Sequence, residues 1–472
     1  MLLQIAPILP EGERKKFQLR AISPVDGRYG EVTLKLQNTS SEWGLINYRF
    51  NVGRKYLKAL AADEEISKAA RFTERDKEII LAWTDRPLTE EEVNKVKEIE
   101  KRTNHDVNAL LEFMGTILKF EGLSEQALAH IHFAMTSADL DNISRSWSLL
   151  DSEDILAEKI VANGETMVAM AKEQANTAML TFTHGQPATP STFGHMVAVF
   201  VDRSNYLFKE VRGRKIRVKF GGATGTMAAH KFAYPDIEWR AFAKKFVEGL
   251  HPRFEYNRYT TQIESYDSHA LYFGALVAYN NVLIDFCRDM WTYISMEYVK
   301  QRPKAGEVGS SAMPHKVNPI DFENAEGNLL VANALLNLFK DKLQISRLYR
   351  DLTDSTVIRN WGMSLAYCLI AYNSIARGLG KIQVDVLFMH KDLMAHPQVI
   401  MEAIQTFLRT TGDTEAYNKC KEFSRGASIT MEDITDFIDS LSIDRDQKDY
   451  LHTLRADTYT GYASEIAATI NS

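Results

Sequence analysis

Residues Ala270 to Trp291 read ALYFGALVAYNNVLIDFCRDMW, and apolar side chains occur on nearly every side of the helix that this stretch predicts. A helix that is apolar on all faces needs neighbours on all faces. We expect a single subunit to supply too few of these neighbours, so we predict a bundle of helices that is shared between subunits. The alternative is a buried core helix within a monomer.

The placement of prolines also favours long helices. No proline occurs between Pro87 and Pro187, or between Pro319 and Pro397. Apolar residues recur near the helical repeat in three further segments: Ile143, Trp147 and Leu150; Phe193, Val197, Phe200, Leu207 and Val211; Val357, Trp361, Leu365, Leu369 and Tyr372. Alternating strand patterns with hairpin turns are scarce. We therefore predict an all-α protein.

A chain of 472 residues is too long for one simple core, so we expect two or three domains. We place the boundaries near Glu125 and Gly380. The expected division is an N-terminal helical domain over 1–125, a central domain of long bundled helices over 126–380, and a small C-terminal helical domain over 381–472.

Composition excludes several classes of protein. The net charge of −6 argues against a nucleic-acid-binding surface. Cys287, Cys368 and Cys420 are far apart and lack metal-binding spacing, which argues against a disulfide framework or zinc site and fits a reducing cytoplasm. No apolar run approaches the ~20 residues that span a bilayer. The apolar stretch at the start of the chain is followed by charged residues, whereas a secretory signal carries its charged residues before the apolar stretch. We expect a cytoplasmic protein with no membrane partner.

The chemically densest stretch is GSSAMPHKVNP, residues 309–319. Glycine permits unusual backbone angles and proline rules out a helix, so we predict a polar loop that acts as a mobile lid or anion cradle. The alternative is a surface loop that links two helices. The pattern SSxMPxKxNP resembles the signature of the fumarase/aspartase superfamily, whose members eliminate fumarate from succinyl-type substrates.

Further segments, in unbroken order from about Ser23 to the C-terminus, resemble the adenylosuccinate lyase family. They are SPVDGRY from Ser23, RTNHDV from Arg102, THGQPATP from Thr183, TTQIE from Thr260 and RDLTDST from Arg350. The resemblance implies a three-domain fumarase/aspartase-type fold, with long central helices forming a bundle in a homotetramer. It implies active sites shared between subunits, and the chemistry needs no cofactor and no metal.

The implied reaction is β-elimination of fumarate. Adenylosuccinate would give AMP, and the succinyl-carboxamide ribotide SAICAR would give AICAR, both in purine nucleotide biosynthesis. By the resemblance, Ser310 is the general base and His184 the general acid. A serine needs nearby cations or amide groups to act as a base, and Lys316 is the obvious loop cation. Imidazole titrates near neutral pH and so suits the acid.

The substrates carry two carboxylates and a phosphate, which arginine can bind bidentately. The resemblance places the following residues in substrate binding: Arg28, Tyr29, Asn104, His105, Asp106, Thr136, Ser137, Gln262, Ser311, Lys316, Asn318, Asn324, Arg350, Ser355, Thr356 and Arg359. The same reading gives Asp106 or a neighbour the task of orienting His105.

The glycine-rich segment Lys219 to His230 departs from the family pattern. Close relatives tend to carry asparagine where this chain has Gly221 and Ala228, so we assign no substrate contact there. Two rival functions remain. One is another fumarate-releasing lyase, such as argininosuccinate lyase, aspartase or fumarase. The other is a catalytically silent structural protein on the same scaffold.

Overall fold

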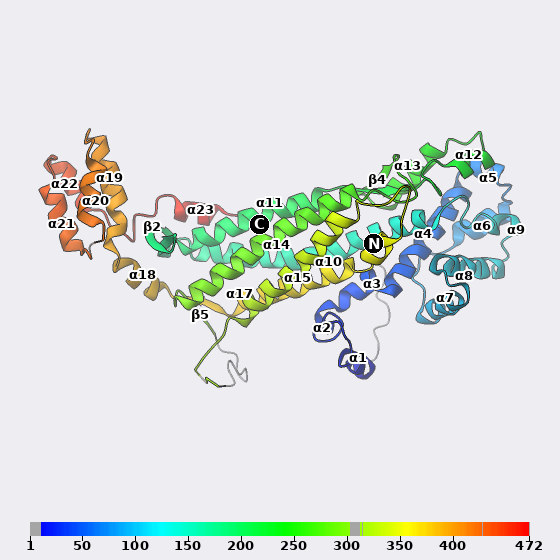
Figure 1. The fold of residues 1–472 in the computed structure, drawn as a ribbon, viewed down its shortest axis with the longest axis horizontal. Coiled ribbons are helices and arrows are strands. Elements are labelled where there is room, and N and C mark those ends of the chain that lie inside the picture. The colour runs from blue at the N-terminus through cyan, green and yellow to red at the C-terminus, as the bar shows by residue number, and fades with distance from the viewer. Residues whose placement is uncertain (1–10, 303–311, 314, 427, 472) are drawn as a thin grey trace. The chain divides into compact units, whose positions relative to one another are not determined.

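The computed structural model describes residues 11–302, 312–313, 315–426 and 428–471, and these are mainly helical (Figure 1). Backbone contacts divide the chain into two compact units. Unit 1 comprises residues 1–159, 207–281 and 327–373, and unit 2 comprises residues 160–206, 282–326 and 374–472. The all-α prediction is confirmed. The boundaries near Glu125 and Gly380 stay a prediction.

Five long helices contribute residues to both units. They are α10 (Ser137–Glu173), α11 (Phe193–Gly213), α14 (Asp267–Ser295), α15 (Ile320–Lys342) and α17 (Trp361–Lys381). The proline-free stretches contain α10, α15 and α17, as the sequence predicts. The apolar stripe beginning at Phe193 coincides with α11, but the stripe beginning at Val357 is divided between α17 and a short preceding helix, α16 (Thr353–Ile358).

The remaining elements of unit 1 lie wholly within that unit, and apart from α4, which has 21 residues, they are shorter than the five long helices. They are α1 (Glu11–Gln18), α2 (Gly30–Thr33), η1 (Leu34–Leu36), α3 (Gln37–Ser40), α4 (Glu42–Ala62), α5 (Glu64–Ala69), α6 (Glu74–Ala82), α7 (Glu90–Thr103), α8 (Asp106–Phe120), α9 (Glu125–Leu128), β3 (Ile216–Lys219), α12 (Ala228–Ala233), α13 (Trp239–Leu250) and β4 (Phe254–Asn257). Strands β3 and β4 pair in parallel, with Lys219 opposite Asn257.

Unit 2 combines two antiparallel strand pairs with small helices. Its elements are β1 (Ala178–Thr183), β2 (Gln186–Thr192), β5 (Val299–Gln301), β6 (Ile382–Val384), α18 (Val386–Met394), η2 (Pro397–Ile400), α19 (Met401–Thr410), α20 (Ala416–Ser424), α21 (Met431–Ser440), α22 (Arg445–His452) and α23 (Ala463–Thr469). Ile404, Leu408, Ile434 and Ile438 are buried in the core that the C-terminal helices share. Capping boxes at Thr430 and Asp444 define where α21 and α22 begin.

Polar side chains connect the long helices of unit 1. The Nδ2 group of Asn280, on α14, donates to Oδ1 of Asn333 on α15 over 2.9 Å. The hydroxyl of Tyr372, on α17, donates to Oδ1 of Asn280 over 2.6 Å. Asn280 and Tyr372 are fully buried. A buried amide stays in place only when its hydrogen bonds are made, so this network selects one register of the three helices.

Helix α14 contains the stretch with which the sequence argument began. By length and composition it is, among the described residues, the one helix that could cross a membrane, but 67% of its most apolar window is buried inside the structure. That burial is typical of the core helix of a soluble protein. Leu271 and Trp291 nevertheless remain exposed on it, at 61% and 47%.

Candidate functional site

The structure distributes the predicted site residues between the two units. Unit 1 holds Arg28, Tyr29, Asn104, His105, Asp106, Thr136, Ser137, Gln262, Arg350, Ser355, Thr356 and Arg359. Unit 2 holds His184, Lys316, Asn318 and Asn324. The predicted general base Ser310 and its neighbour Ser311 lie outside the described residues.

A sharp turn between α7 and α8 carries the Asn104–His105–Asp106 motif. Asn104 ends α7 in the left-handed conformation, with φ of 51°, which asparagine tolerates better than most residues. His105 then caps α8, because its Nδ1 accepts a hydrogen bond from the backbone N–H of Asn108 over 3.2 Å. In the neutral ring the proton must therefore lie on Nε2. His105 is 43% exposed, so that N–H is available to a ligand.

A buried arginine connects this turn to the start of α10, and a second buried arginine, on α10 itself, completes the ion cluster. Arg49, on α4, lies 2.9 Å from Asp106 and 2.5 Å from Asp141. Arg145 lies 2.8 Å from the other oxygen of Asp141. Burial alone would raise the pKa of Asp141, but the guanidinium groups of Arg145 and Arg49 outweigh it and hold that pKa far below its usual range. The carboxylate of Asp106 lies 2.9 Å from Arg49 and, with its other oxygen, 3.8 Å from Nδ1 of His105. The expectation that Asp106 orients His105 stays a prediction.

Thr136 and Ser137 lie where α10 begins. The backbone N–H of Thr136 donates to Oδ2 of Asp139 over 2.8 Å, and Ser137 is the first residue of the helix. Asp141 follows one turn later, so the ion cluster and the Thr136–Ser137 pair share the first turns of one helix. The structure thus joins two motifs that are about thirty residues apart in the sequence.

A cavity of about 220 Å³ opens beside the same helix. Arg145 and Arg359 line it, together with the hydroxyl-bearing Ser41 and Ser148. Arg359 is exposed, whereas Arg145 is almost fully buried. Guanidinium and hydroxyl groups are the donors that phosphate and carboxylate oxygens need, so the cavity has the chemistry of an anion site.

Gln262 and Arg350 meet in the same unit. Nη1 of Arg350 donates to Oε1 of Gln262 over 3.4 Å. Two residues after Gln262, the carboxyl of Glu264 is buried and accepts from Nδ2 of Asn257 over 2.8 and 3.0 Å. Burial raises the pKa of Glu264 to about 7, although the bond from Asn257 opposes the shift.

The remaining predicted residues of unit 1 lie on short elements. Arg28 is exposed in the turn before α2, and Tyr29 precedes the first residue of that helix. Ser355 and Thr356 lie on α16. Burial raises the pKa of the adjacent Asp354, and the charge of Arg350 opposes that rise. Arg350 therefore interacts electrostatically with Asp354 on α16 and also donates a hydrogen bond to Gln262.

His184 occupies the tip of a β-hairpin. Thr183 pairs with Gln186, so His184 and Gly185 form a two-residue turn, with φ of 54° and 71°. This conformation is that of the hairpin turns in which both central residues have positive φ. A histidine in the left-handed region is uncommon and often functional. The side chain of His184 is exposed to solvent.

The described part of the signature loop is exposed at Lys316, and the backbone N–H of Lys316 donates to the carbonyl of Met313 over 3.1 Å. Asn318 is half-buried just before α15. Asn324, on α15, accepts from the hydroxyl of Ser374 over 2.7 Å. The observed contact of Asn324 is thus between helices, and its predicted contact with the succinyl group stays a prediction.

Sequence reasoning missed Arg49, Arg145 and Asp141, which hold the predicted residues in place. Arg145 and Asp141 are four residues apart on α10, a spacing that predicts an ion pair on a helix. That signal was available in the sequence. Nothing in the sequence relates Arg49 to Asp106 or Asp141, because those contacts depend on the packing of α4 against α8 and α10.

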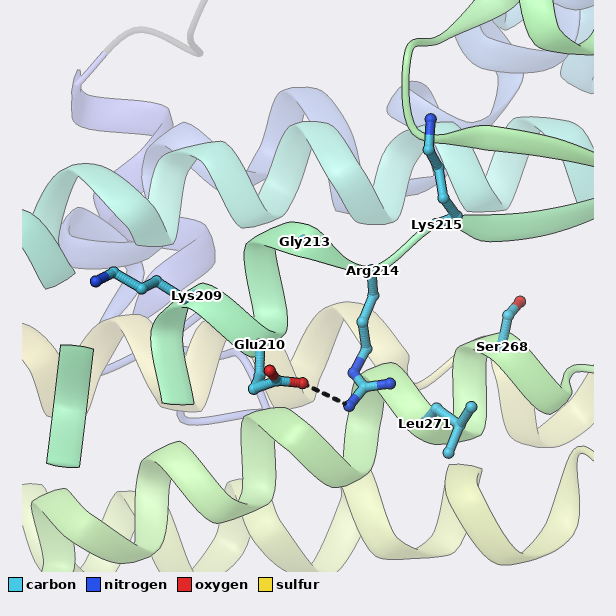
Figure 2. Close-up of a pocket in the computed structure, with 7 residues that line it drawn as sticks. All are labelled: Lys209, Glu210, Gly213, Arg214, Lys215, Ser268 and Leu271. Atoms are coloured by element: carbon cyan, nitrogen blue, oxygen red, sulfur yellow. Dashed lines mark hydrogen bonds and ion pairs between the residues drawn. The ribbon is translucent and has the colours of Figure 1, made fainter. Parts of the chain in front are cut away.

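A larger cavity of about 370 Å³ lies where α11 ends. It is lined by Lys209, Glu210, Gly213, Arg214, Lys215, Ser268 and Leu271. Figure 2 shows Lys209 and Lys215 extending in different directions, while Arg214 turns toward Glu210, which it contacts at 3.2 Å. The cations do not converge on one point, so this cavity is a poor match for an anion.

Comparisons with known proteins identify the family of this chain. A family model described as lyase matches residues 27–333, and one described as adenylosuccinate lyase C-terminal matches residues 346–460. The adenylosuccinate lyase of Dictyostelium discoideum is 44% identical and covers 94% of this chain and 97% of its own. The adenylosuccinate lyase of Legionella pneumophila (strain Corby) is 41% identical, and the match covers 95% of this chain and 98% of that protein. The adenylosuccinate lyase of Escherichia coli (strain K12) is 40% identical, and the match covers 94% of this chain and 97% of that protein.

Solved structures resemble the fold at low sequence identity. A fumarate lyase from Mesorhizobium sp. BNC1 superposes with a TM-score of 0.67 at 16% identity, covering 92% of this chain and 97% of its own. A 3-carboxy-cis,cis-muconate lactonizing enzyme from Pseudomonas putida gives 0.65 at 18% identity, over 96% and 97%. At such identity these two show the fold alone. The matches of both family models and the 40–44% identity to full-length relatives show that this chain belongs to the adenylosuccinate lyase family.

Proposed function

We propose that the protein is a carbon–nitrogen lyase that cleaves adenylosuccinate to AMP and fumarate, and SAICAR to AICAR and fumarate. The observation that carries the proposal is the relation to curated adenylosuccinate lyases along nearly the whole of both chains. The anion-binding chemistry around Arg145 and Arg359 supports it, because both substrates carry a phosphate and two carboxylates.

The reaction needs a base, an acid and donors for developing charge. Ser310, as an alkoxide stabilised by Lys316, takes the proton from the succinyl carbon next to a carboxylate. The electron pair of that C–H bond forms the double bond of fumarate as the C–N bond breaks. The nitrogen keeps the C–N electron pair and takes a proton from His184. No electrons leave the system, so the step requires no redox partner.

The described geometry suggests how the substrate is held. His105 offers its Nε2 proton, and Arg350 and Arg359 offer guanidinium groups, to phosphate or carboxylate oxygens. The hydroxyls of Thr136 and Ser137 suit a succinyl carboxylate. Arg28, Tyr29, Ser355 and Thr356 complete the nucleotide contacts by family analogy. Gln262, Ser311, Asn318 and Asn324 complete those of the succinyl part.

A homotetramer with shared active sites is part of the proposal. One face of α15 exposes Gly327, Leu330, Val331, Ala334 and Leu338, and the segment from Gly327 to Leu338 spans about three helical turns without a charge. An apolar stripe of this kind is typical of a helix that packs against another subunit. His184, exposed at its hairpin tip, could then serve the substrate-binding residues of another subunit.

We also propose a cytoplasmic location. The three cysteines are all buried and free, which fits a reducing compartment, and purine nucleotides are soluble substrates. The test of the whole proposal is fumarate release by the purified protein, followed by absorbance. Adenylosuccinate, SAICAR, argininosuccinate, aspartate and malate are supplied in parallel. Release from the first two alone is expected, and release only from another substrate would replace the proposal with a sister activity.

A mixing experiment tests the shared site. Ser310→Ala and His184→Ala should each abolish turnover and leave the oligomer intact. If Ser310 and His184 of one site come from different subunits, then exchanging subunits between the two inactive proteins should restore part of the activity. Continued inactivity after mass spectrometry has shown mixed oligomers would contradict a shared site.

A further inference from the structure

A fully buried ion pair lies beside the predicted succinyl-binding residues of unit 1. Nζ of Lys219, the last residue of β3, lies 2.5 Å from Oδ1 of Asp139, and neither side chain is exposed to solvent. The ammonium also donates to the carbonyl of Gly222 over 2.9 Å. Burying two charges is costly unless further hydrogen bonds satisfy them, so such a pair requires a structural or functional explanation.

The carboxylate of Asp139 holds two stretches of backbone together. Oδ1 accepts from the N–H of Gly221 over 2.8 Å, and Oδ2 accepts from Gly222 over 3.0 Å and from Thr136 over 2.8 Å. With Lys219 this makes four donors on two oxygens. Asp139 thus ties the Thr136–Ser137 pair directly to the glycine-rich stretch.

The opposite side of the glycine loop, residues 221–225, packs against the segment that carries Gln262. Gly225 has a φ of 76°, and a Cβ built on it would lie 2.2 Å from the carbonyl oxygen of Thr260 and 2.7 Å from that of Thr261. At Gly222 a Cβ would lie 3.0 Å from the carbonyl oxygen of Ala134. Only glycine fits at Gly225, where the backbone is both left-handed and in close contact.

The β3–β4 strand pair provides a second connection between Lys219 and the segment that carries Gln262. Asn257 stands opposite Lys219 in the β3–β4 pair. The side chain of Asn257 donates to both oxygens of Glu264, two residues beyond Gln262. The glycine loop therefore restricts the backbone just before Gln262, and the side chain of Asn257 restricts the backbone just after it.

We propose that Asp139 and Lys219 are positioning residues, which lock the glycine loop between Thr136–Ser137 and Gln262 and so set the spacing of the groups that bind the substrate's succinyl carboxylates. This inference rests on the proposed function. It gives a task to a segment in which the sequence indicates no substrate contact. The pair touches no substrate itself and acts through the backbone that it holds.

The decisive variant is Asp139→Asn, which preserves shape but replaces one acceptor oxygen with a donor. A misplacement of about 1 Å at such a site costs about 100-fold in rate. We expect kcat/KM for adenylosuccinate to fall about 100-fold, and the affinity for succinate as a competitive inhibitor to fall with it. The affinity for AMP, which lacks the succinyl group, should change less than about threefold.

A double variant separates positioning from stability. In Asp139→Asn/Lys219→Met both charges are removed, and replacing a buried ion pair with apolar groups is often neutral for stability. We expect the melting temperature lost in Asp139→Asn to be largely regained, while succinate affinity stays low. Recovery of full succinate affinity in the double variant would overturn the proposal.

Two matched controls exclude general damage. Gly225→Ala forces the loop away from Thr260 and should reproduce the loss of succinate affinity, whereas Gly122→Ala has a φ of 87° and open space, and should not. Glu153→Gln removes a different buried carboxylate, one that pairs with Arg253 at 2.7 Å, and should leave the AMP-to-succinate affinity ratio unchanged. A change of the AMP-to-succinate affinity ratio in Gly122→Ala or in Glu153→Gln would show that the effect is nonspecific and would overturn the assignment.

Amide hydrogen exchange tests the lock without relying on turnover. In Asp139→Asn, peptides that cover 134–140 and 219–227 should exchange at least tenfold faster than in the wild type, with peptides of α14 unchanged. Unchanged exchange in the first two would overturn the lock, even in an active enzyme. If the wild type fails to cleave adenylosuccinate but the exchange result holds, the proposed function fails and the structural lock stands.

Discussion

Arg49 lies 2.9 Å from the carboxylate of Asp106, and this ion pair ties the turn between α7 and α8 to the interior of unit 1. Arg49 contacts Asp141 on its other side, and its own side chain is only 4% exposed. Removing the cation would leave two carboxylates facing each other in a partly buried place.

Arg49→Met should therefore destabilise the protein by roughly 3 kcal/mol, the typical cost of breaking a buried ion pair from one side. Because the turn carries His105, we also expect KM for adenylosuccinate to rise. Thermal unfolding and steady-state kinetics measure the two effects. Arg75→Met, which breaks an exposed pair with Glu78, is the control and should cost less than about 1 kcal/mol. Equal effects of the two variants would contradict this account.

His105 combines a helix cap with a free Nε2 proton, and two variants separate these roles. In His105→Asn the amide oxygen can still cap α8, so the melting temperature should stay near that of the wild type. Loss of the Nε2 donor should still lower kcat/KM about tenfold or more. His105→Ala should show the same kinetic loss and, in addition, about 1 kcal/mol of destabilisation from the lost cap. Full activity in His105→Asn would make the residue a cap alone.

Glu264 should make stability depend on pH. Its folded pKa, about 7, is raised above the unfolded value near 4.5, so the folded state binds the extra proton between these two values. Stability from this group is fully present below about pH 4.5 and is lost as the pH rises to about 7, a change of roughly 3 kcal/mol. Glu264→Gln should remove this dependence, so the stability of the variant relative to the wild type should increase from pH 5 to pH 8.

Melting temperatures at pH 5 and pH 8 measure the Glu264 effect. Glu255→Gln, at an exposed position on β4, is the matched control and should follow the wild type at both values. A Glu264→Gln protein that tracks the wild type across the range would show that the carboxyl titrates normally.

The apolar stripe on α15 predicts which substitutions should dissociate the proposed oligomer. Leu330→Glu would bury a charge against another subunit, so we expect dissociation and loss of activity together. Phe120→Glu replaces a residue that is 90% exposed on α8, outside the stripe, and should leave the oligomer intact. Light scattering after size-exclusion chromatography gives the mass of each variant. An intact oligomer in Leu330→Glu would place the subunit interface elsewhere.

Most of the helical architecture could be read from the sequence, since long apolar stripes and missing prolines leave few alternatives. The break between α16 and α17 could not be read, because the apolar repeat from Val357 to Trp361 continues through it. The hairpin at His184 was also missed. Its two-residue turn uses His-Gly in place of the Asn-Gly that usually marks such turns, and its strands are short.

Local sequence determined the helices of this protein and the chemical types of its candidate site residues, because helical periodicity and side-chain chemistry are properties of neighbouring residues. Tertiary structure alone decided which carboxylate meets which cation. Asp139 and Lys219 are eighty residues apart, and Arg49 and Asp141 are more than ninety. Such pairs depend on how helices and strands pack, and burial then makes those contacts strong, because water no longer competes for the charges.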